Sequence, residues 1–309
     1  MTSLTPKWFP KALRSPKPEA RPSRSTGDGP VLLHVLDGFL TAGSSASLVS
    51  QQLRGPDGTT VHEFDLDAIY DYRARRPPIV FDADHYRSYE PPRLAITREY
   101  DVTGREYLLL SGPEPDFGWE HFVAEVIEVI DRENVSLVVG LGAVPMGVPH
   151  TRPPMITAHA TKPELVDRRN LWEAEITVPS SAQTLLEYRL GQRGADAVGY
   201  VVHVPHYLTQ VEYPTAAIAV LEAAGLRAGL TFDLEDLRAQ QPAAIAQIEE
   251  QIHEQNGEDV LTGLEEQYDA FARGAARSLL EDDVQLPSGD ELAAQLERFL
   301  AQHRPDDHG

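Results

Sequence analysis

Continuous apolar runs and amphipathic segments alternate along residues 30–232. Residues 31–36, 135–141 and 198–204 are short runs rich in β-branched side chains. Such runs are typical of strands that are buried on both faces of a mostly parallel sheet. Between them, apolar residues recur every third or fourth position, most clearly in the broad stripe from Trp119 to Ile130, and this spacing indicates helices. The alternation predicts one α/β domain built on a mostly parallel sheet.

Three further patterns modify this picture. Residues 94–100 and 106–110 flank a turn that contains Gly104, which predicts an antiparallel hairpin and therefore a mixed sheet. Residues 61–66 fit another strand. Residues 67–92 show neither period and predict a long irregular excursion, and a loop of that length inside a compact domain usually serves as a lid or a contact surface.

Capping residues predict where several helices begin and end. Asp116 is a suitable N-cap for the helix that carries the apolar stripe. Ser180 or Ser181 is suited to begin another helix. Pro214 and Gly225 bracket a third segment in the order that helices favour, with proline at the start and glycine at the end.

The two ends of the chain differ from the middle. Residues 1–29 are rich in Pro, Ser and basic side chains and predict a disordered basic tail, with a basic arm for an acidic partner as the alternative. Residues 233–309 predict a helical C-terminal region, in which two helices form an antiparallel hairpin with a narrow apolar seam. A capping box at Ser288 and Glu291 predicts one more helix.

Composition and charge exclude several classes of protein. The net charge is −21, and residues 233–309 alone carry 19 acidic and five basic side chains. A body this acidic repels phosphate backbones, so nucleic acid is not an expected partner. No apolar run approaches the roughly 20 residues of a membrane-spanning helix, and the N-terminus has no apolar signal segment. We therefore expect a cytoplasmic protein with no membrane partner, and the lack of cysteine excludes disulfides and thiolate sites.

The best candidate site follows the strand predicted at residues 135–141. There a glycine-rich loop that includes Gly142 leads to His150, Thr151 and Arg152. In open α/β sheets, ligands bind beyond the carboxyl ends of the strands, so these three residues are candidate ligand-binding residues. Arginine can hold a carboxylate or phosphate with two hydrogen bonds, and histidine can exchange a proton near neutral pH.

The same edge of the sheet should receive side chains from the strand predicted at residues 198–204. His206 and Tyr207 follow that strand directly. His150, Arg152 and His206 are therefore the candidates for acid-base catalysis, and Glu114 or Asp116 could orient a histidine. The alternative is that His150 and Arg152 only fix the loop, as His159 and His203 are expected to be satisfied core histidines.

A weaker candidate lies after the first strand. Asp37 and Gly38 form a turn before a helix start rich in small residues, among them Gly43. The free backbone N–H groups of a helix start can hold an anion, and for that reason Asp37, Gly38, Gly43 and Gly142 are also candidate ligand-binding residues. Close packing of the helix on the sheet explains the small residues equally well, and we favour it.

No cofactor or metal site is predicted. The chain has neither a dinucleotide-binding nor a P-loop glycine pattern next to its first strand, and it has no GxSxG nucleophile motif. Its histidines are scattered and lack a helical pair with a nearby carboxylate, which argues against a metal centre.

Four segments, in order, resemble one family. They are the turn at Asp37-Gly38-Phe39, GPEPDFGW at residues 112–119, GLGAVPMGVPHTRP at residues 140–153, and HVPHYL at residues 203–208, which is followed by Tyr213-Pro214. Together they resemble the proteasome assembly chaperone family in its actinobacterial branch. The resemblance implies a three-layer α/β/α sandwich similar to that of purine nucleoside phosphorylases, a helical C-terminal appendage and a homo-oligomer.

Two hypotheses for function follow. The first, implied by the resemblance, is a non-enzymatic protein-binding or assembly scaffold whose partners are further copies of itself and proteasome subunits. Some archaeal relatives dock through a C-terminal hydrophobic-Tyr-any tripeptide, a mode that we do not expect here because the sequence ends in Asp307-His308-Gly309. The alternative is a small-molecule enzyme or binder of phosphorylase or hydrolase type, or a carboxylate-amine ligase, that uses the His150–Arg152 loop.

Overall fold

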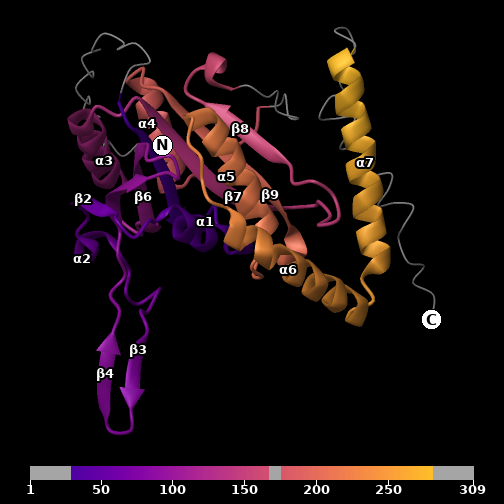
Figure 1. The fold of residues 1–309 in the computed structure, drawn as a ribbon, viewed down its shortest axis with the longest axis horizontal. Helices are drawn as coiled ribbons and strands as arrows, with labels where there is room; N and C mark the ends of the chain where they lie inside the picture. The colour runs from indigo at the N-terminus through magenta and orange to yellow at the C-terminus, as the bar shows by residue number, and fades with distance from the viewer. Residues whose placement is uncertain (1–28, 167–174, 281–309) are drawn as a thin grey trace, which may run out of the picture.

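A seven-stranded mixed sheet forms the centre of the molecule (Figure 1). The computed structural model describes residues 29–166 and 175–280. The strand order is β2-β5-β6-β1-β7-β9-β8, with β1 pairing in parallel to both β6 and β7, and β7 pairing in parallel to β9. Antiparallel pairing joins β2 to β5, β5 to β6 and β8 to β9, so five of the seven strands run in one direction. The strands are β1 (Val31–Asp37), β2 (Thr59–Glu63), β5 (Ala95–Tyr100), β6 (Glu106–Pro113), β7 (Leu137–Met146), β8 (Ile156–Ala160) and β9 (Ala197–Pro205).

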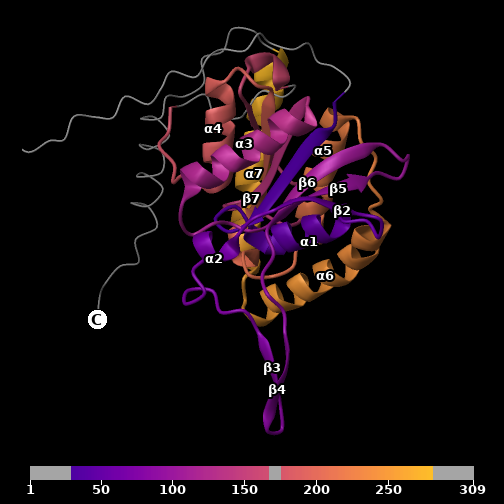
Figure 2. The same ribbon diagram turned by 90° about the vertical axis from the view of Figure 1, so that its left-hand side faces the viewer.

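Helices cover both faces of this sheet, which gives three layers (Figure 2). On one face, the buried side chains of α1, α5 and α6 pack into one apolar cluster with the sheet. On the other face, those of α2, α3 and α4 form a second cluster. The predicted α/β class with a three-layer sandwich is therefore confirmed. The helices of the two layers are α1 (Ser45–Leu53), α2 (Leu66–Ile69), α3 (Trp119–Glu133), α4 (Ala182–Gln192), α5 (Pro214–Ala228) and α6 (Glu235–Glu254).

Burial on both faces explains why the central strands are continuously apolar. In β1, six of the seven residues are buried, and β7 and β9 show the same pattern over most of their length. Because β1, β7 and β9 pair in parallel, their carboxyl ends lie at the same edge of the sheet. This is the edge that carries the predicted site.

Helix ends agree with the sequence only in part. Ser181 caps α4 as expected, and its hydroxyl accepts the backbone N–H of Thr184. The prediction that Asp116 caps α3 is wrong, because the N-cap is Gly118 in a left-handed conformation. Helix α5 also continues through Gly225 and ends at Gly229. Gly225 serves close packing instead, since a Cβ there would lie 2.8 Å from the carbonyl oxygen of Leu230.

The segment predicted to be an irregular excursion contains a second, two-stranded sheet. Strands β3 (Ile79–Asp82) and β4 (His85–Tyr89) form an antiparallel hairpin that projects away from the body in both views (Figures 1 and 2). Its turn contains Ala83 with a φ of 52°, a position where glycine or asparagine would have given a clear signal. The strand predicted at residues 61–66 is also shifted, because β2 ends at Glu63 and Leu66 begins α2.

After α6, the chain reverses at residues 255–257 and enters α7 (Glu258–Leu280). The expected antiparallel helical hairpin is not formed, because α7 diverges from α6 (Figure 1) and contacts the loop that follows β7. The basic tail and the helix predicted after Ser288 lie outside the described residues. Among the helices of the described ranges, none has the length and apolar character needed to cross a membrane.

Candidate functional site

The loop that follows β7 lies against the end of β9 through His150 and Tyr207. The backbone N–H of His150 donates to the Tyr207 hydroxyl at 3.0 Å, and the hydroxyl lies 2.8 Å from the imidazole Nδ1. Since the hydroxyl oxygen accepts from the backbone, its own hydrogen is free to point at Nδ1. Burial lowers the pKa of His150, against the opposing effect of Glu249 and Glu265, so the ring is neutral near pH 7.

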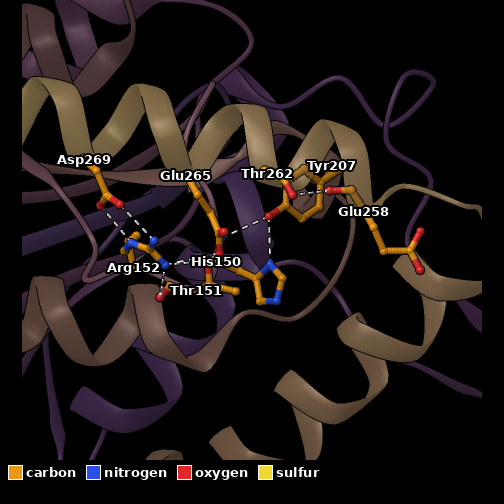
Figure 3. A network of polar contacts seen from close by, with 8 residues as sticks. All are labelled: His150, Thr151, Arg152, Tyr207, Glu258, Thr262, Glu265 and Asp269. Atoms are coloured by element: carbon orange, nitrogen blue, oxygen red, sulfur yellow. Dashed lines mark hydrogen bonds and ion pairs between the residues drawn. The ribbon is translucent and has the colours of Figure 1, made fainter.

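Arg152 does not face an open cavity, because α7 lies across it (Figure 3). Its Nε donates to Oδ1 of Asp269 at 2.9 Å, and Nη2 donates to Oδ2 at 3.0 Å, which is the two-bond geometry that arginine favours with a carboxylate. A third contact joins Nη1 to Glu265 at 3.2 Å. Hydrogen bonding to Arg152 lowers the pKa of Asp269. The carboxylate that the sequence led us to expect at Arg152 is thus supplied by the chain itself.

Two more contacts fasten α7 to the same loop. The Thr151 hydroxyl donates to Glu265, and the Tyr268 hydroxyl donates to the carbonyl oxygen of Pro153 at 2.8 Å. Glu265, Tyr268 and Asp269 were not among the residues that we predicted. The apolar periodicity of α7 pointed to a seam with α6, and only the four-residue spacing of Glu265 and Asp269 could have suggested a polar face directed at an arginine.

The second candidate histidine stands apart from this group. His206 begins a short 3₁₀ turn after β9 and is exposed to solvent, with its ring against that of Tyr207 at a centroid distance of 5.4 Å. Its carbonyl oxygen accepts the Thr209 hydroxyl. The structure therefore brings His150, Thr151, Arg152 and Tyr207 together, and leaves His206 exposed beside Tyr207.

At the end of β1, a carboxylate of the chain occupies the turn of Asp37 and Gly38. Oε2 of Glu114 accepts the backbone N–H of Phe39 at 2.9 Å, and Oε1 accepts that of Ala182, in the first turn of α4, at 2.7 Å. The backbone N–H of Glu114 also donates to the Asp37 carbonyl oxygen. A Cβ on Gly38 would lie 2.0 Å from that carboxylate, so glycine is required there. Glu114 does not orient a histidine, because it joins the first turn to α4.

The small residues near this turn serve close packing. Gly43 has a φ of +67°, and a Cβ there would meet Val204 and Tyr213 at 3.2 Å. A Cβ on Gly142 would meet Leu40 at 3.1 Å. Gly43 also exchanges backbone hydrogen bonds with Thr209 and Tyr213. These contacts agree with the interpretation that we favoured for the small residues.

The remaining acidic candidate, Asp116, is likewise engaged away from the histidines. Its carboxylate accepts the backbone N–H of Asp71 and pairs with Arg75 at 2.6 Å. In the ranges that the structure covers, no three histidine, aspartate or glutamate side chains are placed to hold a metal ion.

Comparison with known proteins identifies the family. The family model described as the PAC2 family matches residues 35–255, which is most of the chain. The chain belongs to the PAC2 family. This agrees with the resemblance noted in its four motifs. No curated protein is similar enough to count as a relative.

Several solved structures share this fold. A Mycobacterium tuberculosis protein of unknown function, Rv2714, is 42% identical, with a TM-score of 0.76 over 84% of this chain and 90% of that one. A Corynebacterium glutamicum protein of unknown function is 33% identical, with a TM-score of 0.75 over 84% and 97% of the two chains. The Mycobacterium tuberculosis proteasome-assembly chaperone homologue Rv2125 is 28% identical, with a TM-score of 0.64 over 72% and 95%. This PAC2 chain therefore has the fold of a proteasome-assembly-chaperone-like protein.

Proposed function

We propose that this PAC2 protein is a non-enzymatic assembly scaffold that binds further copies of itself and proteasome subunits in the cytoplasm. The observation that carries the proposal is the apolar face of the β3–β4 hairpin. Ile79 lies opposite Tyr89 in the hairpin, and Phe81 lies opposite Tyr86. Directly paired residues share a face of a sheet, and Ile79 and Phe81 lie two positions apart on β3, so these four large side chains project together.

This face has the properties of a protein-binding surface. The four side chains are 49–68% exposed, and the rings of Phe81 and Tyr86 meet edge to face at a centroid distance of 5.4 Å. An isolated two-stranded hairpin is marginally stable in water, and a group of exposed aromatic side chains marks an interaction site. Aromatic residues also supply much of the energy at protein interfaces. A partner protein that covers this face would stabilise the hairpin.

The resemblance to Rv2125, which is named as a proteasome-assembly chaperone homologue, supports proteasome subunits as the further partner. The alternative, an enzyme that uses the His150–Arg152 loop, has less support. The guanidinium of Arg152 is engaged by Asp269 and Glu265, so the loop holds α7 in place of a small anion.

The proposal is tested with the full-length protein and two variants. Phe81→Ser/Tyr86→Ser removes the aromatic pair, and Val80→Ser/His85→Ser alters the opposite face of the same hairpin as a matched control. We expect sedimentation velocity to show self-association of the wild type and the control, with dissociation of the aromatic variant. Affinity purification with mass spectrometry should recover proteasome subunits with the wild type. A wild-type protein that remains monomeric and recovers no proteasome subunit would contradict the scaffold hypothesis.

A further inference from the structure

Four residues at one level of the sheet form a row with a histidine at each end. His34 of β1 is paired with Gly140 of β7, Gly140 with Gly199 of β9, and Gly199 with His159 of β8. Residues aligned in this way across neighbouring strands share a face. The row therefore reads His-Gly-Gly-His, on the side of the sheet that α4 covers.

The two glycines admit the two imidazole rings. A Cβ on Gly140 would lie 2.8 Å from Cε1 and Nε2 of His34, and a Cβ on Gly199 would lie 2.1 Å from Cε1 of His159. Each ring thus leans inward over the neighbouring glycine. Glycine inside a strand often marks such a close approach, and here it allows two histidines to converge from opposite sides.

Helix α4 packs over this row. Oε1 of Glu187 lies 2.8 Å from Nδ1 of His159. One turn earlier, the Gln183 carboxamide accepts the backbone N–H of Leu36 at 2.7 Å and donates to the Leu141 carbonyl oxygen at 3.2 Å. Strands β1 and β7 pair only as far as His34 and Gly140, so Gln183 fills the gap where the two strands part. A cavity of about 10 Å³, room for one water-sized atom, remains between the row and the helix.

One ring nitrogen of His34 lacks the partner that a buried polar group needs. It is 3% exposed, and its Nδ1 has no hydrogen-bond partner among the described residues. The charged or titratable groups that face it are Glu187 of α4 and His159 of β8. The side chains from β6 and α3 in the same cluster are apolar. A positive charge on His34 would therefore be poorly solvated while α4 is in place.

We propose that the His34-Gly140-Gly199-His159 row is an acid-sensitive latch that keeps α4 closed over the gap between β1 and β7. When a proton enters His34, the closed state must hold a buried cation, and the state in which α4 has moved away is favoured because water then reaches the ring. Opening frees the Leu36 N–H and the Leu141 carbonyl oxygen that Gln183 satisfies. These two groups, a donor and an acceptor at the carboxyl edge of the sheet, could then bind another carboxamide in place of that of Gln183.

The size of the effect follows from proton linkage. Burial lowers the pKa of His34 from 6.5 to about 4 in the closed state, against a smaller opposing effect of Glu187. With an ordinary pKa of 6.5 in the open state, the closed form is favoured above pH 6.5 and loses that advantage as the pH falls toward 4. The opening equilibrium constant should then rise roughly 20-fold between pH 7 and pH 5.

Hydrogen-deuterium exchange of the full-length protein, corrected for the intrinsic rate at each pH, tests the latch. We expect protection of Ala182–Gln192 to fall roughly 20-fold from pH 7 to pH 5, while Pro214–Ala228 on the opposite face keeps its protection. In His34→Gln this pH dependence should disappear. The control His62→Gln removes a partly exposed histidine that pairs with Glu125 on α3 and should retain it.

Two results would overturn the proposal. One is an α4 whose protection does not change between pH 7 and pH 5, or changes only in step with α5. The other comes from a measurement that needs no variant, the titration of the His34 ring by NMR in the wild-type protein. A folded-state pKa near 6.5 would show that burial does not exclude the proton, and the latch would have no basis even if His34→Gln fails to fold.

Discussion

Arg152 and Asp269, 117 positions apart in the chain, form an ion pair with two parallel hydrogen bonds of 2.9 and 3.0 Å. This pair joins the loop after β7 to α7, and Glu265 adds a third contact to the same guanidinium. The arginine that resembled an anion-binding residue in the sequence thus holds a helix of its own chain. An arginine just beyond a strand end can bind an anion or hold a helix, so its position alone does not distinguish the two roles.

Removal of the Asp269 charge should loosen α7 without unfolding the sheet. In Asp269→Asn the two-bond ion pair is lost while Glu265 still contacts Arg152, so we expect hydrogen exchange in Glu258–Leu280 to rise by roughly fivefold at most, the limit for a partly exposed ion pair. Arg238→Gln, which breaks an exposed pair with Glu222 between α6 and α5, is the control and should leave α7 unchanged. Equal exchange in wild type and Asp269→Asn would show that other contacts fix α7.

The fold was largely predictable because burial on both faces leaves a clear mark on strands. The runs at β1, β7 and β9 could be recognised without any knowledge of their neighbours. The position of α7 could not, because the same apolar periodicity is compatible with packing against α6 or against the loop that follows β7. The loop of the candidate site could be located for the same reason, but the partners of Arg152 could not: the arginine is visible in the sequence, and the carboxylates that reach it lie more than 110 positions away.

The β3–β4 hairpin shows a second limit. Its turn has no glycine or asparagine, and the alternation of its strands is interrupted by an irregularity between Val80 and Phe81. Neither the turn signal nor the period of two was therefore present in the sequence. The two helix ends that we misplaced have a related cause. Gly118 and Gly225 were not recognised as a cap and a packing residue because their roles depend on tertiary contacts.

The Tyr207 hydroxyl should contribute measurably to stability. Tyr207→Phe leaves the backbone N–H and the Nδ1 of His150 without their partner, and a buried polar group that loses its hydrogen bond costs about 1–3 kcal/mol. Chemical denaturation should show this loss at an unchanged m-value. Tyr188→Phe is the matched control, because that side chain is 60% exposed and should change stability by less than about 0.5 kcal/mol. A loss of less than about 0.5 kcal/mol in Tyr207→Phe as well would mean that water replaces the hydroxyl.

His150 should make the protein less stable in acid. Because burial lowers its pKa below the unfolded value, the unfolded chain binds the proton more readily than the folded one. The stabilising contribution is therefore complete above the unfolded pKa of about 6.5 and is lost as the pH falls below it. We expect the difference in Tm between pH 7.5 and pH 5.5 to be smaller in His150→Gln than in the wild type, as measured by calorimetry. His85→Gln, which replaces an exposed histidine at the hairpin tip, should keep the wild-type difference.

A comparison of alanine substitutions at Gly43 and Gly104 should separate the effect of close packing at Gly43 from the effect of backbone strain. Both have positive φ, +67° and +82°, but a Cβ would meet Val204 and Tyr213 at Gly43 and nothing within 4 Å at Gly104. Alanine in the left-handed region costs about 1–2 kcal/mol. Gly104→Ala should show that cost alone, and Gly43→Ala should lose a further 1–3 kcal/mol, roughly, from overpacking. Equal losses of unfolding free energy in the two variants would contradict close packing, and would return the helix start at Gly43 to consideration as an anion site.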